Sequence, residues 1–142
     1  MKKPNSSQQA KTSPSITTVL KVISDEKALV LFNNIVASDY SNDGIISPKK
    51  INLSNKQYYS RLSGLLKADL IKRRKGKYTP TMLGKIVYDS QTIIVEALSH
   101  YWKLKALDQI ETSNSDLPNE EVKRLINTLI DSYRIKDVLM KT

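Results

Sequence analysis

The side chains with the clearest chemistry in this sequence are basic, and they are concentrated in one quarter of it. Between Lys49 and Lys85 there are eleven Lys or Arg residues and one acid, Asp69, which gives a formal charge of +10 over 37 residues. The other 105 residues carry twelve bases and thirteen acids, so the net charge of +9 belongs to this segment. A cluster of like charges repels itself, and a folded domain that keeps one usually has a polyanionic partner. Nucleic acid is therefore the first partner to expect.

Side chains suited to catalysis or metal binding are sparse. The chain has no cysteine and one histidine, His100, which leaves no thiolate nucleophile, no Cys-ligated metal and no His-rich metal cluster. The sequence contains no paired carboxylates in an apolar context and no glycine-rich loop suited to phosphate. We therefore expect a protein that is not an enzyme and has no cofactor or metal, while a small-molecule effector stays an open question.

Length and composition suit one domain, or a small domain with a dimerisation appendage, since 142 residues with 39% apolar content can build a core. Residues 1–14 are rich in Lys, Ser, Gln and Thr and lack the apolar stretch of a signal peptide, so we expect a disordered tail. No apolar run approaches the roughly 18 to 20 residues of a membrane span. The expected location is the cytoplasm, in association with the nucleoid.

Two helices should precede the basic segment. The first begins near Ser15, although its β-branched residues also allow a strand, and the second begins at Asp25-Glu26, where acids suit a helix N-terminus. Apolar residues at helical spacing mark their buried faces: Ile16, Val19, Leu20 and Ile23 in the first, and Leu29, Phe32, Ile35 and Val36 in the second. A turn over 39–44 ends the second helix, and a stub of strand at 45–46 follows.

A helix-turn-helix arrangement should carry the first part of the charge. Ser47 caps a brief helix over 48–51, and Asn52 can adopt the left-handed backbone that ends it. Ser54 then caps a helix that runs to about Ala68, and Gln57 three residues later completes a capping box. Two helices joined by about three residues form the helix-turn-helix motif.

The faces of the 54–68 helix separate by residue type. Tyr58, Leu62, Leu65 and Leu66 should be buried, while the opposite side is polar and contains no acid. Arg61 and Gln57 have the geometry for bidentate contacts to guanine or adenine. Gly64 fits either a close approach to a phosphate or tight packing on a neighbouring helix. The candidate DNA-binding residues of this helix are Ser54, Asn55, Lys56, Gln57, Tyr59, Ser60, Arg61, Ser63 and Lys67.

A hairpin should follow, with strands over 70–74 and 77–81 and a tight turn in which Gly76 takes a positive φ. Five bases in six residues are more than the protection of a sheet edge requires, although a solvated basic turn is the alternative. Contacts to the DNA backbone are predicted for Lys49, Lys50, Lys72, Arg73, Arg74, Lys75, Gly76 and Lys77.

The run from Leu53 to Arg73, with Lys-Gln-Tyr-Tyr-Ser-Arg at 56–61, the Gly-Lys-Tyr at 76–78 and the Thr-x-x-Gly-Lys at 81–85, resembles archaeal winged-helix transcriptional regulators of the ArsR-like type. More narrowly, it is similar to the small winged-helix proteins common in ammonia-oxidising archaea, and the similarity covers residues 16–140. The resemblance implies DNA binding by the helix from Ser54 and by a wing at Gly76, with no particular operator or ligand.

Two residues depart from the pattern of that family. Asp69 stands where glycine is frequent between the recognition helix and the wing, and Pro80 stands where an apolar strand residue is usual. We expect Pro80 to weaken pairing in the second wing strand. Metal-sensing relatives use Cys or His ligands, which this chain lacks, so metal sensing is not implied.

A long helix should run from about Met82 to Ile110, roughly 43 Å. Apolar residues lie on more than one of its sides, so more than one side must be covered, and residues 122–130 provide a further apolar helix. A second copy of the chain is the expected cover, because a twofold dimer matches two half-sites about one DNA turn apart. A monomer in which the C-terminal helix buries these residues is the alternative. The predicted dimer interface contains Ile94, Leu98, Tyr101 and Trp102.

The expected fold is therefore mainly α with a small β-hairpin wing: a winged helix-turn-helix over 15–82 and a dimerisation region over 83–142. The leading hypothesis is a homodimeric transcriptional regulator that reads a palindromic site in double-stranded DNA through helix 54–68 and contacts the backbone through the wing at 70–81. An architectural chromatin protein and a winged-helix adaptor for other proteins are the alternatives.

Overall fold

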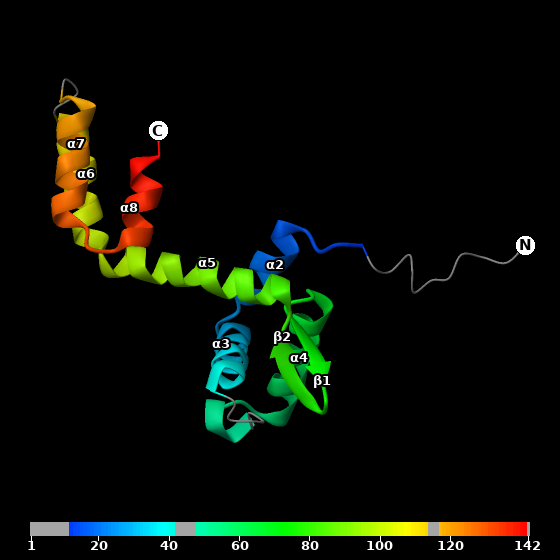
Figure 1. Cartoon of the computed structure of the whole chain (residues 1–142). Helices are drawn as coiled ribbons and strands as arrows, with labels where there is room; N and C mark the ends of the chain where they lie inside the picture. The colour runs from blue at the N-terminus through cyan, green and yellow to red at the C-terminus, as the bar shows by residue number, and fades with distance from the viewer. Residues whose placement is uncertain (1–11, 42–47, 114–116, 142) are drawn as a thin grey trace, which may run out of the picture. The chain divides into compact units, whose positions relative to one another are not determined.

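The computed structural model describes residues 12–41, 48–113 and 117–141, which are mainly helical with one small antiparallel sheet (Figure 1). Residues 1–11 of the tail expected over 1–14, residues 42–44 of the expected turn, the strand stub at 45–46 and the Ser47 cap lie outside the described residues. The expected start of the turn at residue 39 is wrong, because the helix that begins at Glu26 continues to Ser41. The chain divides into two compact units between Tyr88 and Asp89, six residues after the boundary expected from the sequence. Among the described residues, no helix has the length and apolar character needed to cross a membrane.

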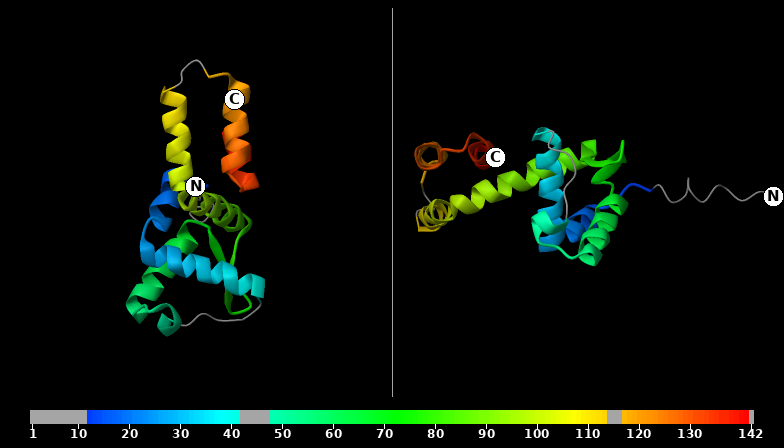
Figure 2. Two further views of the ribbon diagram at one scale, coloured as in Figure 1. Left: turned by 90° about the vertical axis from the view of Figure 1, so that its left-hand side faces the viewer. Right: turned by 90° about the horizontal axis from the view of Figure 1, so that it is seen from below.

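The first unit contains all elements before the boundary, together with the first turns of the helix Met82–Ser99, which continues into the second unit. Figure 2 shows these elements from two further directions. They are α2 (Ile16–Ile23), α3 (Glu26–Ser41), the 3-10 helix η1 (Pro48–Ile51), α4 (Asn55–Lys67), β1 (Ile71–Arg74), β2 (Lys77–Pro80) and the start of α5 (Met82–Ser99). The two strands form an antiparallel ribbon in which Ile71 pairs with Pro80 and Arg74 with Lys77. Pro80 thus stays in register as the last residue of β2.

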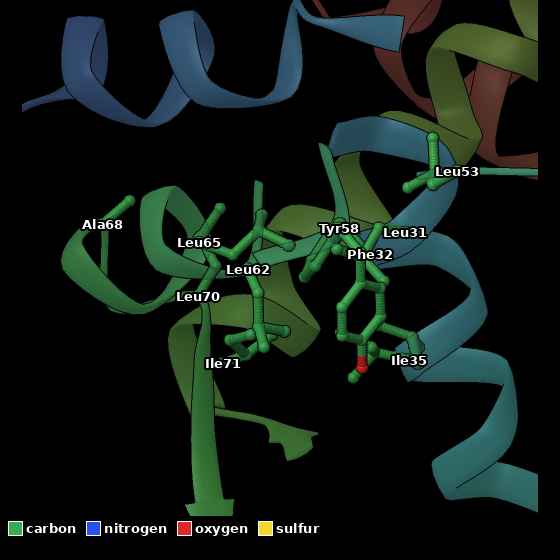
Figure 3. Packing of buried hydrophobic residues seen from close by; sticks show 11 residues of the cluster. Leu31, Phe32, Ile35, Leu53, Tyr58, Leu62, Leu65, Ala68, Leu70 and Ile71 are labelled. Carbon is green, nitrogen blue, oxygen red and sulfur yellow. The ribbon is translucent and has the colours of Figure 1, made fainter. Parts of the chain in front are cut away.

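One hydrophobic core holds the first unit together (Figure 3). The deepest side chains come from α3, α4 and the start of β1, and Phe32, Leu65 and Leu70 have no exposed surface. The predicted stripe of α3 is confirmed at three positions, with Leu31 buried in place of Leu29. Full burial of such a side chain contributes about 1.5 to 3 kcal/mol. The buried cluster contains Leu31, Phe32, Ile35, Val36, Leu53, Tyr58, Leu62, Leu65, Ala68, Leu70 and Ile71.

Three positions that were predicted to be buried, one on α4 and two on α2, are exposed. Helix α2 begins after its Ser15 cap as expected, but Ile16 and Leu20 are 75% and 53% exposed, because α2 contacts the core through Val19, Val22 and Ile23. Leu66 of α4 is exposed as well, because α4 turns only the side that bears Tyr58, Leu62 and Leu65 toward the core.

The junction between α4 and β1 explains why aspartate can stand at position 69. Asp69 has a φ of +62°, in the left-handed region that favours glycine and that aspartate tolerates better than most residues. Its carbonyl accepts a hydrogen bond of 2.6 Å from the Thr81 hydroxyl, and the same hydroxyl accepts one from the Gly84 amide. Thr81 therefore caps α5 and ties its start to the end of α4.

Gly84 fixes how closely α5 approaches this junction. A Cβ atom at position 84 would lie 2.0 Å from the backbone oxygen of Leu70, a separation that no side chain could accept without backbone movement. Gly64 of α4 differs, since an added Cβ would meet nothing within 4 Å. Tight packing as the reason for Gly64 is therefore wrong.

The second unit contains the rest of α5, α6 (Tyr101–Ser113), α7 (Asn119–Leu129) and α8 (Tyr133–Met140). Its core is small: Ile126, Ile130 and Ile135 are buried, with partly buried neighbours that include Leu104 and Leu107. The apolar helix expected over 122–130 is α7, which ends one residue earlier, at Leu129, and buries Ile126. A short helix, α8, follows it.

The expected single helix from Met82 to Ile110 is wrong, because α5 ends at Ser99 and α6 begins at Tyr101. No proline or glycine lies at the break. Instead, the backbone carbonyl of Glu96 accepts the Ser99 hydroxyl at 2.6 Å and lies 2.9 Å from Nδ1 of His100. The His100 amide is shared between the carbonyls of Glu96 and Ala97. Such side-chain competition for a helix carbonyl interrupts the regular ladder.

Candidate nucleic-acid interface

Helix α4 is built as predicted. Ser54 accepts a hydrogen bond from the Gln57 amide, and the Gln57 side-chain oxygen accepts one from the Ser54 amide, both at 3.1 Å. This capping box fixes the first turn of α4 and satisfies two amides that a helix end would otherwise leave unpaired. It also occupies the carbonyl oxygen of Gln57, one of the two side chains expected to make bidentate contacts to bases.

The second expected bidentate side chain, Arg61, is also engaged. Its Nε donates to Oδ2 of Asp25 at 2.9 Å, and the Arg61 side chain is 30% exposed. The same Asp25 oxygen accepts a hydrogen bond from the Ala28 amide at 2.9 Å and so caps α3. Together the Arg61 bond and the Ala28 amide hold the pKa of the Asp25 carboxyl below its ordinary value. Arg61 therefore connects the middle of α4 to the first turn of α3.

The side chains of α4 that remain on the surface form what we call the polar face. It contains no acid, and Tyr59 at its centre is 64% exposed, with its ring 5.1 Å from that of Tyr58 in an edge-on arrangement. Burial raises the pKa of the Tyr58 phenol, which belongs to the core. The polar face consists of Asn55, Lys56, Tyr59, Ser60, Ser63 and Lys67.

The β1–β2 ribbon carries the densest charge, and we call Lys72, Arg73, Arg74, Lys75 and Lys77 the ribbon bases. Its turn is as predicted at Gly76, with φ of +76°, and Lys75 before it also has a positive φ of +53°. Two successive positive φ values are typical of a type I′ turn, where Asn, Asp and Gly are the common residues. A lysine in this conformation costs about 1 kcal/mol of backbone energy. Its position puts a cation at the tip of the ribbon.

The pairing register sorts the ribbon bases onto two faces. Lys72 pairs with Thr79 and Arg74 with Lys77, so Lys72, Arg74 and Lys77 share one face. Arg73 lies on the other face, with its guanidinium 5.9 Å from the centre of the Tyr78 ring. Like charges directly opposite each other destabilise a strand pair, and Arg74 opposite Lys77 is such a pair.

No ribbon base forms an ion pair within the described parts of the chain, and all five are exposed. Lys49 and Lys50 of η1 are exposed as well. The first unit as a whole carries sixteen Lys or Arg residues against five acids. The arrangement is thus an uncompensated cationic surface next to a polar helix face, and it can bind a polyanion.

The residues predicted for a dimer interface lie in the second unit. Ile94, Leu98, Tyr101 and Trp102 are 58%, 65%, 45% and 80% exposed, and Val95 adjoins them at 64%. Ile94, Val95 and Leu98 lie at helical spacing near the end of α5, and Tyr101 and Trp102 are the first two residues of α6. We call these five residues the apolar stripe.

Sequence reasoning missed two residues that shape the interface. Asp25 was expected only to favour the start of α3, and its bond to Arg61 joins residues 36 positions apart. Gly84 was noted as part of the Thr-x-x-Gly pattern. The reason for a glycine there, the close approach of its backbone to Leu70, becomes visible only in the folded chain. Among the residues that the structure describes, no group of His, Cys, Asp or Glu side chains is placed to hold a metal ion.

Comparison with known proteins gives no relative: no family model, no curated protein and no solved structure matches the chain.

Proposed function

We propose that the chain is a DNA-binding transcriptional regulator of winged-helix type, in which the polar face of α4 lies in the major groove and the ribbon bases contact phosphates. The observation that carries the proposal is the set of five exposed ribbon bases without ion-pair partners among the described residues. A bound polyanion would relieve their mutual repulsion, and α4 beside them offers donors without acids.

Titration of the full chain against a duplex library with random cores, at 50 and 200 mM salt, tests the proposal. If a dimer neutralises six to ten phosphates, its affinity should fall about 10³- to 10⁵-fold between these conditions. Lys75→Ala should weaken binding to every sequence, whereas Lys105→Ala, an exposed lysine of α6, serves as the matched control and should leave it unchanged. Absence of binding at 50 mM salt would refute the proposal and favour the adaptor function.

An architectural DNA-binding protein is the second candidate, and one observation favours it. Arg61 and Gln57, the two side chains best suited to read a base through paired hydrogen bonds, are engaged inside the first unit. A duplex library separates the two candidates, because a regulator enriches a defined sequence and an architectural protein does not.

We also propose that the protein acts as a homodimer through the apolar stripe. A stripe this exposed is unusual on a monomer, and partner surfaces are enriched in aromatic residues such as Trp102. Leu98→Glu should convert the dimer to a monomer, and light scattering at micromolar protein concentration measures the change in mass. Asn127→Glu, on exposed surface of α7, is the control, and a monomeric wild-type protein would contradict the proposal.

A further inference from the structure

Arg61 could have one of two roles in the proposed DNA complex, and its contact with Asp25 indicates which one. As a base reader, Arg61 would contact a base edge with its guanidinium, either after leaving Asp25 or through the two terminal nitrogens that the Nε bond does not use. As a positioning residue, it would keep the bond to Asp25 and set the angle at which α4 presents its polar face. This question rests on the proposed function of α4.

The geometry of the contact favours the second role. Oδ2 of Asp25 accepts two hydrogen bonds of 2.9 Å, one from Nε of Arg61 and one from the Ala28 amide. The acceptor is therefore itself held by the first turn of α3. A charge-assisted bond to a fixed acceptor restricts the guanidinium more than a bond to a free side chain does. The partner helices α3 and α4 also share the main core, which limits how far the two ends can separate.

The exposed residues of α4 leave Arg61 outside the reading surface. Asn55, Lys56, Tyr59 and Ser60 lie at positions i, i+1, i+4 and i+5, which form one side of a helix, and all four are exposed. Arg61 is only 30% exposed.

We infer that Arg61 is a positioning residue: its bond to Asp25 fixes the orientation of α4, and discrimination between bases belongs to Asn55, Lys56, Tyr59 and Ser60. A small tilt of α4 moves all four side chains relative to the base edges, so the loss of the bond should lower sequence preference without removing a base contact.

A double-mutant cycle on sequence preference tests this inference. The variants are Asp25→Ser, which keeps an N-cap for α3 but is too short to reach Arg61, Arg61→Ala, and the two combined. The readout is the ratio of affinities for the sequence enriched from a random-core duplex library and for a scrambled duplex. This ratio cancels the general change in charge, which affects both duplexes alike.

If Arg61 positions α4, both single variants should lower the ratio by a similar factor, on the order of 3- to 30-fold, the range that coupled pairs show. The double variant should then be no worse than either. Lys56→Ala, on the polar face, should add its own loss to that of Asp25→Ser. Circular dichroism and thermal unfolding of each variant check that α3 and α4 remain folded.

The opposite pattern would overturn the inference. If Asp25→Ser preserves or raises the preference while Arg61→Ala abolishes it, or if both variants lose the preference at one and the same base pair and keep it elsewhere, Arg61 reads a base and Asp25 only holds it. That result would leave the proposed function intact. Absence of any sequence preference in the wild-type protein would overturn the inference together with the regulator, and absence of DNA binding would overturn the proposed function itself.

Discussion

The two units of this chain differ in charge, core and surface. The first unit carries sixteen bases and five acids, the second seven bases and nine acids. Eleven buried residues form the core of the first unit, whereas the second has three and exposes the apolar stripe. The first unit thus has a core of its own and an unneutralised surface, and the second has the surface that an apolar partner would cover. Polyanion binding and self-association are therefore expected in different units.

The largest expected effect concerns the ribbon. Replacing Lys72, Arg74 and Lys77 together by alanine removes three cations from one face of the ribbon. Duplex affinity at 100 mM salt should fall on the order of 100-fold, because a protein that makes fewer phosphate contacts releases fewer counterions from the DNA when it binds. The matched triple in the second unit, at Lys103, Lys105 and Lys136, should change affinity less than about 3-fold by the same reasoning. Fluorescence anisotropy measures both, and equal losses would remove the distinction between the units.

A pair of glycines tests how the first unit is packed. Gly84→Ala should lower the free energy of unfolding by about 1 to 3 kcal/mol or more, because the new methyl group would collide with the Leu70 carbonyl. Gly64→Ala has open space and should raise it by about 0.5 to 1 kcal/mol, since alanine favours helix. Denaturant titration measures both. Reduced duplex affinity of a stabilised Gly64→Ala would support close approach of a phosphate to α4.

Arg134 should be the main polar support of the second unit. Its guanidinium donates to the Thr92 hydroxyl at 2.8 Å and to the Asp89 carbonyl, and it lies 3.5 Å from carboxylate oxygens of Asp89 and Glu96. Arg134→Met keeps the apolar stem and should cost about 1 kcal/mol of stability. Arg124→Met breaks only an exposed pair with Glu121 and should cost less than about 0.5 kcal/mol. Thermal unfolding that ranks the two in the reverse order would contradict this account of the second unit.

The smallest effect is the pH dependence of Asp25. Its folded-state pKa is below the ordinary value of 3.8, so the carboxylate contributes stability that is complete above pH 3.8. This contribution is lost as the pH falls through the lowered pKa. The difference in melting temperature between wild type and Asp25→Ser should therefore be constant near neutral pH and shrink in strong acid. A difference that grows as the pH falls would mean that the bond to Arg61 does not stabilise the charged carboxyl.

Local features were predictable from the sequence where short-range rules decide them. The capping box at Ser54, the left-handed Asn52 and the turn at Gly76 each depend on residues within four positions, and all three are confirmed. The partition of α4 into a buried and a polar side also followed from periodicity, apart from Leu66.

Features that depend on distant residues or on competing hydrogen bonds were not predictable. The Arg61–Asp25 bond joins two helices, and no spacing rule connects positions 36 apart. The end of α5 depends on the Ser99 and His100 side chains, which both lie within hydrogen-bond distance of the Glu96 carbonyl. The sequence has no proline or glycine there to indicate a helix break.

The most direct test of the contrast between the units is an NMR titration of the uniformly ¹⁵N-labelled full chain with the random-core duplex at 50 mM salt. Amide shifts should concentrate in α4 and in the β1–β2 ribbon of the first unit, while α6, α7 and α8 of the second unit stay unchanged. Shifts centred on the second unit, or no shifts at saturating duplex, would contradict the assignment of DNA binding to the first unit.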